Sequence, residues 1–512
     1  MRTIPLTVGH WSVGPRVLLG MVVWGAVFAS GWGLSTVRAD EPKVENTWQV
    51  IQMQGQRVGY VHATTKTEER DGKKVIVSDV FTRMSIRRFG VALTTDVIQK
   101  TEETEEGQLL SVYSLQDNPP FSRTEAKGRV SGQKIILETT NAGKTHTREI
   151  PLPADLKSPS WQDRSLRESP LKVGESRTFQ TFEATLGKVV DIHLTRVEAG
   201  ETTLLSGEKA KLDRIELKQS VLPGITSLIY SDSSGSMKKM EMPLLKMEAF
   251  DCTRDEALRE IAEANIDLGI DTLVKVGVIP NPRETTRVTF RLEAREYDPF
   301  QVYPASTYQG LVKRDDGSFE LTVRAEALPE APREPAPEAR YLASSRYMDL
   351  NDELIQQLSQ RFANEETDVR RIAWAGEKFV HEHLNLKDYK TNLATASEVA
   401  RSRSGDCTEH GVLLAALLRA RKIPARVAAG LVYAASLKAY GGHMWTEAYL
   451  DGRWVPLDAT LANGHGDAIH IKTSDAALED ESSLPVEQML PLIHLLGRTT
   501  LTVEVVEHRK SE

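Results

Sequence analysis

Cysteine is scarce in this chain of 512 residues, which contains only Cys252 and Cys407. Two thiols cannot provide the disulfide framework on which small secreted domains depend, so the chain must fold around hydrophobic cores. Aromatic residues make up only 6% of the composition, and no internal repeat is evident. These absences exclude a disulfide scaffold and a repeat architecture.

Basic residues are outnumbered by acidic residues, with 64 Lys and Arg against 72 Asp and Glu. The formal net charge is -8 at pH 7, and an acidic protein is poorly suited to bind nucleic acid or an anionic membrane. With 40% hydrophobic and 27% charged residues, the composition is that of a soluble globular protein. A chain of this length exceeds one ordinary core, so we expect several domains. The sequence does not predict an oligomeric state.

The first residues have the pattern of an export signal. Arg2 and Arg16 precede a long apolar run, and Val37-Arg38-Ala39 ends in a small-x-small-like cleavage site. We therefore predict a signal peptide at residues 1–39, a periplasmic or secreted protein, and no stable membrane insertion after cleavage. The alternative is that the apolar run is retained as a single-span anchor.

Alternating apolar and polar residues predict that the next part of the chain is built from antiparallel strands. Residues 48–55 and 57–63 are two such runs joined by a short link. We expect a β-rich domain at residues 40–155 and a second β-rich region with a helical insert at residues 156–326, forming two layers or one long sheet. Four prolines within residues 327–339 predict a semi-rigid linker.

Cys407 stands where a loop turns into a strongly apolar helix. Asp406 and Glu409 have the spacing of a capping box, which defines where the helix begins. The free N–H groups and partial positive charge of a helix N-terminus favour the thiolate form of a cysteine. A lone cysteine beside an apolar helix is more often a small buried hydrophobic residue. Cys407 is therefore a candidate nucleophile only if partners for it exist.

Candidate partners lie downstream, between His443 and Asp458. Asp451-Gly452 separates two alternating runs and predicts a hairpin with a two-residue turn. This turn would pair Trp445 with Asp458 and place Asp458 on the same side of the sheet as His443. Cys407, His443 and Asp458 thus fit the roles of nucleophile, base and orienting carboxylate.

These residues resemble the transglutaminase-like superfamily. The resemblance rests on four stretches that occur in the family's order, at residues 396–407, 417–426, 443–445 and 452–458. It implies a papain-like α+β fold for residues 340–512, a Cys-His-Asp triad, and protease, amidase or transglutaminase activity on peptide or protein amides. It also implies that the backbone N–H of Cys407 donates to an oxyanion hole.

The chain departs from the family pattern at two positions. Ala459 and Lys422 stand where many relatives have Pro and Gly, respectively. Both departures look structural and leave the predicted triad intact.

Other histidines offer alternative roles. His410 is close to Cys407 on the same helix, but a helix N-terminus disfavours an imidazolium, so we assign His410 a structural role. His465 and His470 are expected to be surface or edge residues. A zinc site is a further alternative, and its ligands would be Cys407, His410, His443 and Asp458. Because their spacing matches no tight metal motif, we predict neither a metal nor a cofactor.

The sequence therefore predicts a multi-domain protein, with a β-rich antiparallel N-terminal region and a C-terminal α+β domain that carries the chemistry. The predicted function is that of an extracytoplasmic cysteine-dependent amide hydrolase or acyltransferase. The alternative is a non-catalytic cell-surface binding module in which the triad is vestigial.

Overall fold

The structure of the chain is a computed structural model. It describes residues 44–509 except residues 89–90, 119–121, 142–143, 223, 261–265, 268–271, 328–332, 386–393, 462–465, 480–487, 489–490, 493 and 496. The predicted signal peptide lies outside the described residues. The chain divides between residues 271 and 272 into two compact units, which we call the N-terminal unit and the C-terminal unit. No helix within the described ranges combines the length and the apolar character needed to cross a membrane.

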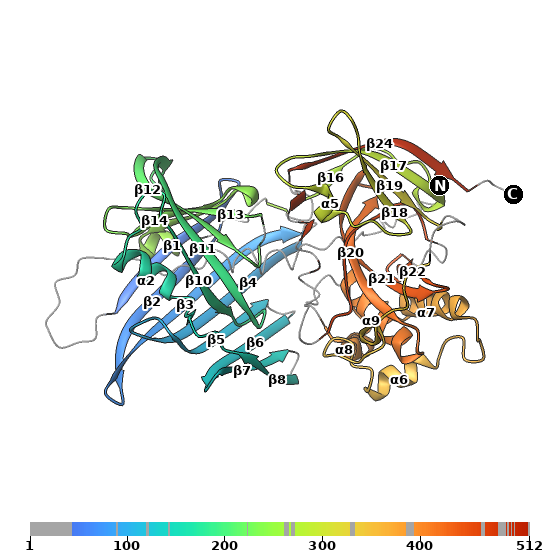
Figure 1. The fold of residues 1–512 in the computed structure, drawn as a ribbon, viewed down its shortest axis with the longest axis horizontal. Helices are drawn as coiled ribbons and strands as arrows, with labels where there is room; N and C mark the ends of the chain where they lie inside the picture. Colours follow the sequence, from blue (N-terminus) through green and yellow to red (C-terminus); the bar gives the residue numbers. More distant parts are fainter. Residues whose placement is uncertain are drawn as a thin grey trace, which may run out of the picture. The chain divides into compact units, whose positions relative to one another are not determined.

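The N-terminal unit is built on a 15-stranded sheet (Figure 1). Its strands are β1 (Glu45–Met53), β2 (Gln56–Arg70), β3 (Lys73–Arg88), β4 (Val91–Thr104), β5 (Leu109–Asn118), β6 (Ser122–Ser131), β7 (Lys134–Asn141), β8 (Lys144–Pro151), β9 (Leu156–Lys157), β10 (Ser176–Glu183), β11 (Lys188–Thr203), β12 (Lys209–Gln219), β13 (Thr226–Ser231), β14 (Met237–Met242) and β15 (Met247–Cys252). The order runs from β8 through β1 to β15 and on to β9. Its described residues also form helices α2 (Trp161–Glu168), η1 (Pro243–Leu245) and α3 (Arg254–Ala257).

The predicted division of the β-rich region near residue 155 differs from this architecture. Strand β1 pairs with β2 and also with β15, as in Trp48↔Cys252, so both predicted regions share one set of backbone hydrogen bonds. Of the alternatives considered, the strands form one long sheet. In the described part of the helical insert, α3 spans four residues after its Thr253 cap. Part of the remaining insert lies outside the described residues.

The C-terminal unit combines two sheets with a group of helices (Figure 1). One sheet contains β16 (Val274–Lys275), β20 (Ala425–Ala434), β21 (Ala439–Leu450), β22 (Arg453–Leu457) and β23 (His470–Ala476); the other contains β17 (Thr285–Ala294), β18 (Gln309–Lys313), β19 (Phe319–Arg324) and β24 (Thr499–His508). The helices are η2 (Pro282–Glu284), α5 (Pro299–Val302), η3 (Ala339–Tyr341), α6 (Glu353–Ser359), α7 (Val369–His383), α8 (Ala396–Ser402) and α9 (Cys407–Ala420). The α+β character predicted for this part of the chain is confirmed.

The proline-rich stretch does not separate two domains. Strand β17, which precedes it in the chain, pairs with β24 near the C-terminus, so both flanks belong to one unit. Its residues 328–332 lie outside the described part. Beyond them, the Glu334 N–H donates to the Gly452 carbonyl at 2.7 Å, and the Tyr449 hydroxyl donates to the Glu334 carbonyl at 2.7 Å. The stretch is thus tied to the β21–β22 hairpin within the C-terminal unit.

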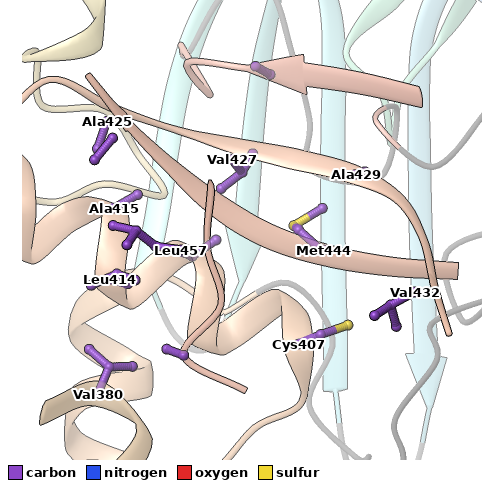
Figure 2. Close-up of a cluster of buried hydrophobic side chains, with 14 of the residues drawn as sticks. Val380, Cys407, Leu414, Ala415, Ala425, Val427, Ala429, Val432, Met444 and Leu457 are labelled. Carbon is purple, nitrogen blue, oxygen red and sulfur yellow. The ribbon is translucent and has the colours of Figure 1, made fainter. Parts of the chain in front are cut away.

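Helix α9 is the central element of the C-terminal unit. Every residue from Gly411 to Arg419 is buried, which is the pattern of a helix packed on all sides. It lies against strands β20 and β21 and contacts helices α6, α7 and α8. Figure 2 shows Cys407 at its first turn, below strands that carry Val427 and Met444. The start of α9 is therefore held by the hydrophobic core itself.

Candidate active site

The start of α9 is defined by the predicted capping box. The Thr408 N–H donates to Asp406 Oδ1 at 3.0 Å, and the Asp406 N–H donates to Glu409 Oε2 at 2.9 Å. Burial, together with the neighbouring Asp406, raises the pKa of Glu409 well above its usual range, which disfavours a second negative charge beside Asp406. Cys407 is the first helical residue and its side chain is fully buried. Its backbone N–H belongs to the first turn, whose amides lack acceptors within the helix.

The hairpin that carries the other two triad candidates has the predicted register. Leu450 pairs with Arg453, and the turn residues Asp451 and Gly452 have φ values of 50° and 83°, as a type I′ turn requires. The pairing continues to Thr446↔Leu457. The next residue in the chain is Asp458.

This register brings His443 and Asp458 together. The Nε2–H of His443 donates to Asp458 Oδ2 at 2.8 Å, and both side chains are buried. A second donor, the Thr460 N–H, lies 2.9 Å from Asp458 Oδ1. The backbone N–H of Asp458 donates to Glu377 Oε1 at 2.7 Å, which anchors the residue to helix α7. The carboxylate is therefore held at both oxygens and at its own backbone.

The imidazole of His443 lies between a carboxylate and the thiol. Burial disfavours its charged form, but the Asp458 carboxylate and the Cys407 thiol outweigh burial and raise the pKa of His443 to about 9. The other ring nitrogen, Nδ1, is buried and has no hydrogen-bond partner among the described residues. Since Asp458 occupies Nε2, Nδ1 is the atom that can exchange a proton with the thiol.

The pKa of Asp458 is shifted in the direction opposite to that of His443. Burial alone would raise the pKa of a carboxyl group. Charge and hydrogen bonds from His443 and His470 outweigh that effect and hold the pKa of Asp458 well below its usual range. The carboxylate is therefore ionised wherever the histidines are charged.

His470 is a residue that the sequence interpretation missed. We expected a surface or edge residue. His470 does begin the edge strand β23, but its side chain is only 9% exposed and points to the candidate triad. Its Nε2 lies 3.1 Å from Asp458 Oδ2, the oxygen that His443 also contacts, and its Nδ1 lies 2.8 Å from Asp467 Oδ1. Asp467 and His470 stand three residues apart in the sequence, but nothing in that spacing points to Asp458. His465, which we grouped with it, lies outside the described residues.

Two of the four ligands considered for zinc, Cys407 and His410, are not among the metal-ligating atoms that converge at the site. His410 Nδ1 donates to the Asp406 carbonyl at 2.6 Å, in keeping with a structural role. Among the described residues, the metal-ligating atoms that converge within 4.8 Å belong to His443, Asp458 and His470. Direct hydrogen bonds between these side chains already account for their close approach.

Trp445 covers the two histidines. Its ring is stacked on His443, with centroids 6.3 Å apart and 20° between the planes, and it meets His470 edge-on at 5.3 Å. Only 2% of Trp445 is exposed, so it shields the ring nitrogens from water on that side. Trp454 packs against Arg426, with the guanidinium carbon 4.1 Å from its ring centroid.

Comparison with known proteins identifies the domain that holds this site. Residues 356–459 match the family model of the transglutaminase-like superfamily. The C-terminal part of the chain is a transglutaminase-like domain. The matched range ends one residue after Asp458 and therefore contains Cys407 and His443, but it does not reach His470. The superfamily is one of cysteine-type enzymes.

Similarity to individual proteins is more distant, and no curated protein matches the chain. A candidate cysteine protease from Cytophaga hutchinsonii is 18% identical over 40% of this chain and 78% of its own, with a TM-score of 0.27. A β-barrel-like protein of unknown function from Brucella abortus is 8% identical over 41% of this chain and 94% of its own, with a TM-score of 0.28. At this level of similarity neither protein informs the function of this chain.

Proposed function

We propose that the protein is an extracytoplasmic cysteine-dependent amide hydrolase or acyltransferase that acts on peptide or protein substrates. The observation that carries the proposal is the convergence of three residues distant in sequence. Cys407 starts helix α9, its thiol is among the groups that raise the pKa of His443, and Asp458 accepts a hydrogen bond from His443 at 2.8 Å. This is the arrangement by which a base activates a nucleophile and a third group orients the base.

The geometry assigns a task to each atom during acylation. The Cys407 sulfur attacks the amide carbonyl carbon while His443 Nδ1 holds the proton of the former thiol. The positive end of α9 and the Cys407 backbone N–H stabilise the negative oxygen of the tetrahedral intermediate. His443 then gives its proton to the departing amine, and a thioester remains on Cys407. Asp458 keeps the imidazole in the required tautomer throughout, because it accepts from Nε2.

The second half of the reaction decides between hydrolysis and transfer. If water attacks the thioester, the products are a carboxylic acid and the free enzyme; if an amine attacks, a new amide forms. We propose hydrolysis as the default outcome, because water needs no second binding site. The location of the protein outside the cytoplasm rests on the export pattern of residues 1–39.

A non-catalytic binding module with a vestigial triad is the competing interpretation. One observation favours it: Cys407 has no exposed surface, so a substrate can reach the sulfur only if the site opens. The charged hydrogen-bonded pair behind the thiol opposes it, since a purely structural cysteine needs no such pair. The two interpretations differ in the chemistry they predict for Cys407.

The test is incubation of the protein with a peptide mixture, with and without a labelled primary amine, followed by mass spectrometry. We expect hydrolysed amides that are absent with Cys407→Ala, nearly absent with His443→Ala and reduced less by Asp458→Ala, because Asp458 transfers no proton itself. His410→Ala is the matched control and should have a mild effect. Amine incorporated into glutamine in a Cys407-dependent manner would overturn hydrolysis in favour of transfer. No Cys407-dependent product of either kind would support the vestigial triad.

A further inference from the structure

Both ring nitrogens of His470 face carboxylate oxygens. Nε2 lies 3.1 Å from Asp458 Oδ2, and Nδ1 lies 2.8 Å from Asp467 Oδ1. An ionised carboxylate only accepts hydrogen bonds, whereas a neutral imidazole has a single N–H. Two short contacts of this kind therefore require an N–H on each nitrogen, and His470 is an imidazolium bridging two carboxylates.

The far side of this bridge is rigidly held. Asp467 is buried, and its Oδ2 accepts a hydrogen bond from Arg283 at 3.2 Å. Its Oδ1 accepts from the Ile469 N–H at 3.3 Å in addition to His470. His470 itself begins strand β23, which pairs with β20 in the central sheet. The imidazolium thus has a fixed anchor independent of the triad.

The near side of the bridge meets the triad at one atom. Asp458 Oδ2 accepts from His443 at 2.8 Å and from His470 at 3.1 Å, while Oδ1 accepts from the Thr460 N–H. Without His470, Oδ2 would have a single donor, and rotation of the carboxylate would be restrained only by that donor and Thr460. The direction of the Asp458–His443 hydrogen bond depends on this restraint.

We propose that His470 is a positioning residue that holds Asp458 Oδ2 against His443 and thereby supports the charged state of the Cys407–His443 pair. This inference rests on the proposed function. It assigns His470 no contact with substrate and no proton transfer. Its effect on the thiol passes entirely through Asp458.

The test uses the reactivity of Cys407 and needs no substrate. In a Cys252→Ser background Cys407 is the only thiol, and its alkylation by iodoacetamide is measured at about pH 6 and about pH 9. An ordinary thiol is mostly protonated at the lower pH and reacts far more slowly there, whereas a thiolate–imidazolium pair reacts at similar rates at both. Because the thiol is buried, the quantity compared is the alkylation rate at the lower pH divided by the rate at the higher pH. Any opening of the site that is common to both measurements cancels in this ratio.

Two substitutions at one position separate the two hydrogen bonds. The amide nitrogen of His470→Gln replaces Nε2 and can donate to Asp458, whereas that of His470→Asn replaces Nδ1 and can reach only Asp467. We expect His470→Ala and His470→Asn to lower the ratio about tenfold, the order expected for loss of a hydrogen bond to a charged group, and His470→Gln to restore most of it. If His470→Ala fails to fold, the comparison of Gln with Asn carries the test alone.

A double-mutant cycle checks that His470 acts through Asp458. The variant that combines Asp458→Ala with His470→Ala should have the same ratio as Asp458→Ala alone. His383→Ala is the control, because the His383 ring is hydrogen-bonded to the Ala400 carbonyl at 2.9 Å and stacks on Phe379, so its effect should add independently. The positioning role would be overturned if the starting protein had a ratio near one and His470→Ala left it unchanged. It would also be overturned if the effects of His470→Ala and Asp458→Ala on the ratio were additive. A ratio far below one in the starting protein would instead overturn the proposed function itself.

Discussion

Replacing Asp458 with Asn should destabilise the C-terminal unit in a pH-dependent manner. The substitution keeps the shape of the side chain and removes the charge that His443 and His470 face. The pKa of each histidine is raised from 6.5 to about 9 in the folded protein. At about 1.4 kcal/mol for each pH unit, one such shift corresponds to about 3 kcal/mol of stability. Asp458 is the largest raising influence on His443, whereas Asp467 is the largest on His470.

The sign of the pH dependence follows from where the protons bind. Since the folded protein holds the histidine protons more tightly than the unfolded chain, this stabilisation is fully present below pH 6.5 and is lost as the pH rises through about 9. We therefore expect the unfolding free energies of the native protein and Asp458→Asn to differ by about 3 kcal/mol near pH 6. The difference should be much smaller above pH 9.

The assay is urea unfolding followed by tryptophan fluorescence across this pH range. The N-terminal unit lacks these contacts, so only the transition that responds to Asp458→Asn is compared. Asp315→Asn is the matched control, because Asp315 is exposed in the same unit, and its effect should not vary with pH. A difference for Asp458→Asn that stays constant from pH 6 to about 10, or that grows with pH, would refute the reasoning.

Three further predictions concern other parts of the chain. Gly405→Ala would place a Cβ 2.3 Å from the Glu409 Cβ, so it should destabilise the start of α9 by about 1–3 kcal/mol and slow alkylation of the thiol. Arg419→Met should lower the free energy of unfolding by about 3–5 kcal/mol, because the buried guanidinium donates to three backbone carbonyls at 2.6 to 2.9 Å; thermal or urea unfolding measures the loss. Arg419→Lys should restore little of this stability, since an ammonium lacks the planar fork. Intact-mass measurement of exported protein should give a mature chain that begins at Asp40, and a species retaining residues 1–39 would instead indicate an anchor.

Local patterns in the sequence were sufficient to predict the elements that carry the three candidate residues. The capping box at Asp406 and Glu409 specified the first residue of α9, because it depends on contacts within four residues. The Asp451-Gly452 turn specified the hairpin register, because a two-residue turn requires the residues on either side of it to pair with each other. Once that register was known, the alternation of side chains along strands placed His443 and Asp458 on the same side.

Contacts between distant segments were decided by the tertiary structure alone. The assignment of strands 285–324 to the C-terminal unit depends on the pairing of β17 with β24, and the single N-terminal sheet depends on the pairing of β1 with β15. In both cases a strand finds a partner about 200 residues away, and alternation predicts that a strand exists without specifying its neighbour. A proline-rich stretch likewise looks the same whether it joins two domains or lies along one.

His470 illustrates the same limit at the candidate site. The sequence by itself predicted which residues are the candidate nucleophile, base and orienting carboxylate, because each belongs to a local motif with a known geometry. The second imidazole on Asp458 belongs to no motif. It reaches the carboxylate because β23 pairs with the far edge of β20, and the hydrogen bonds and charge it contributes exist only after the sheet has assembled.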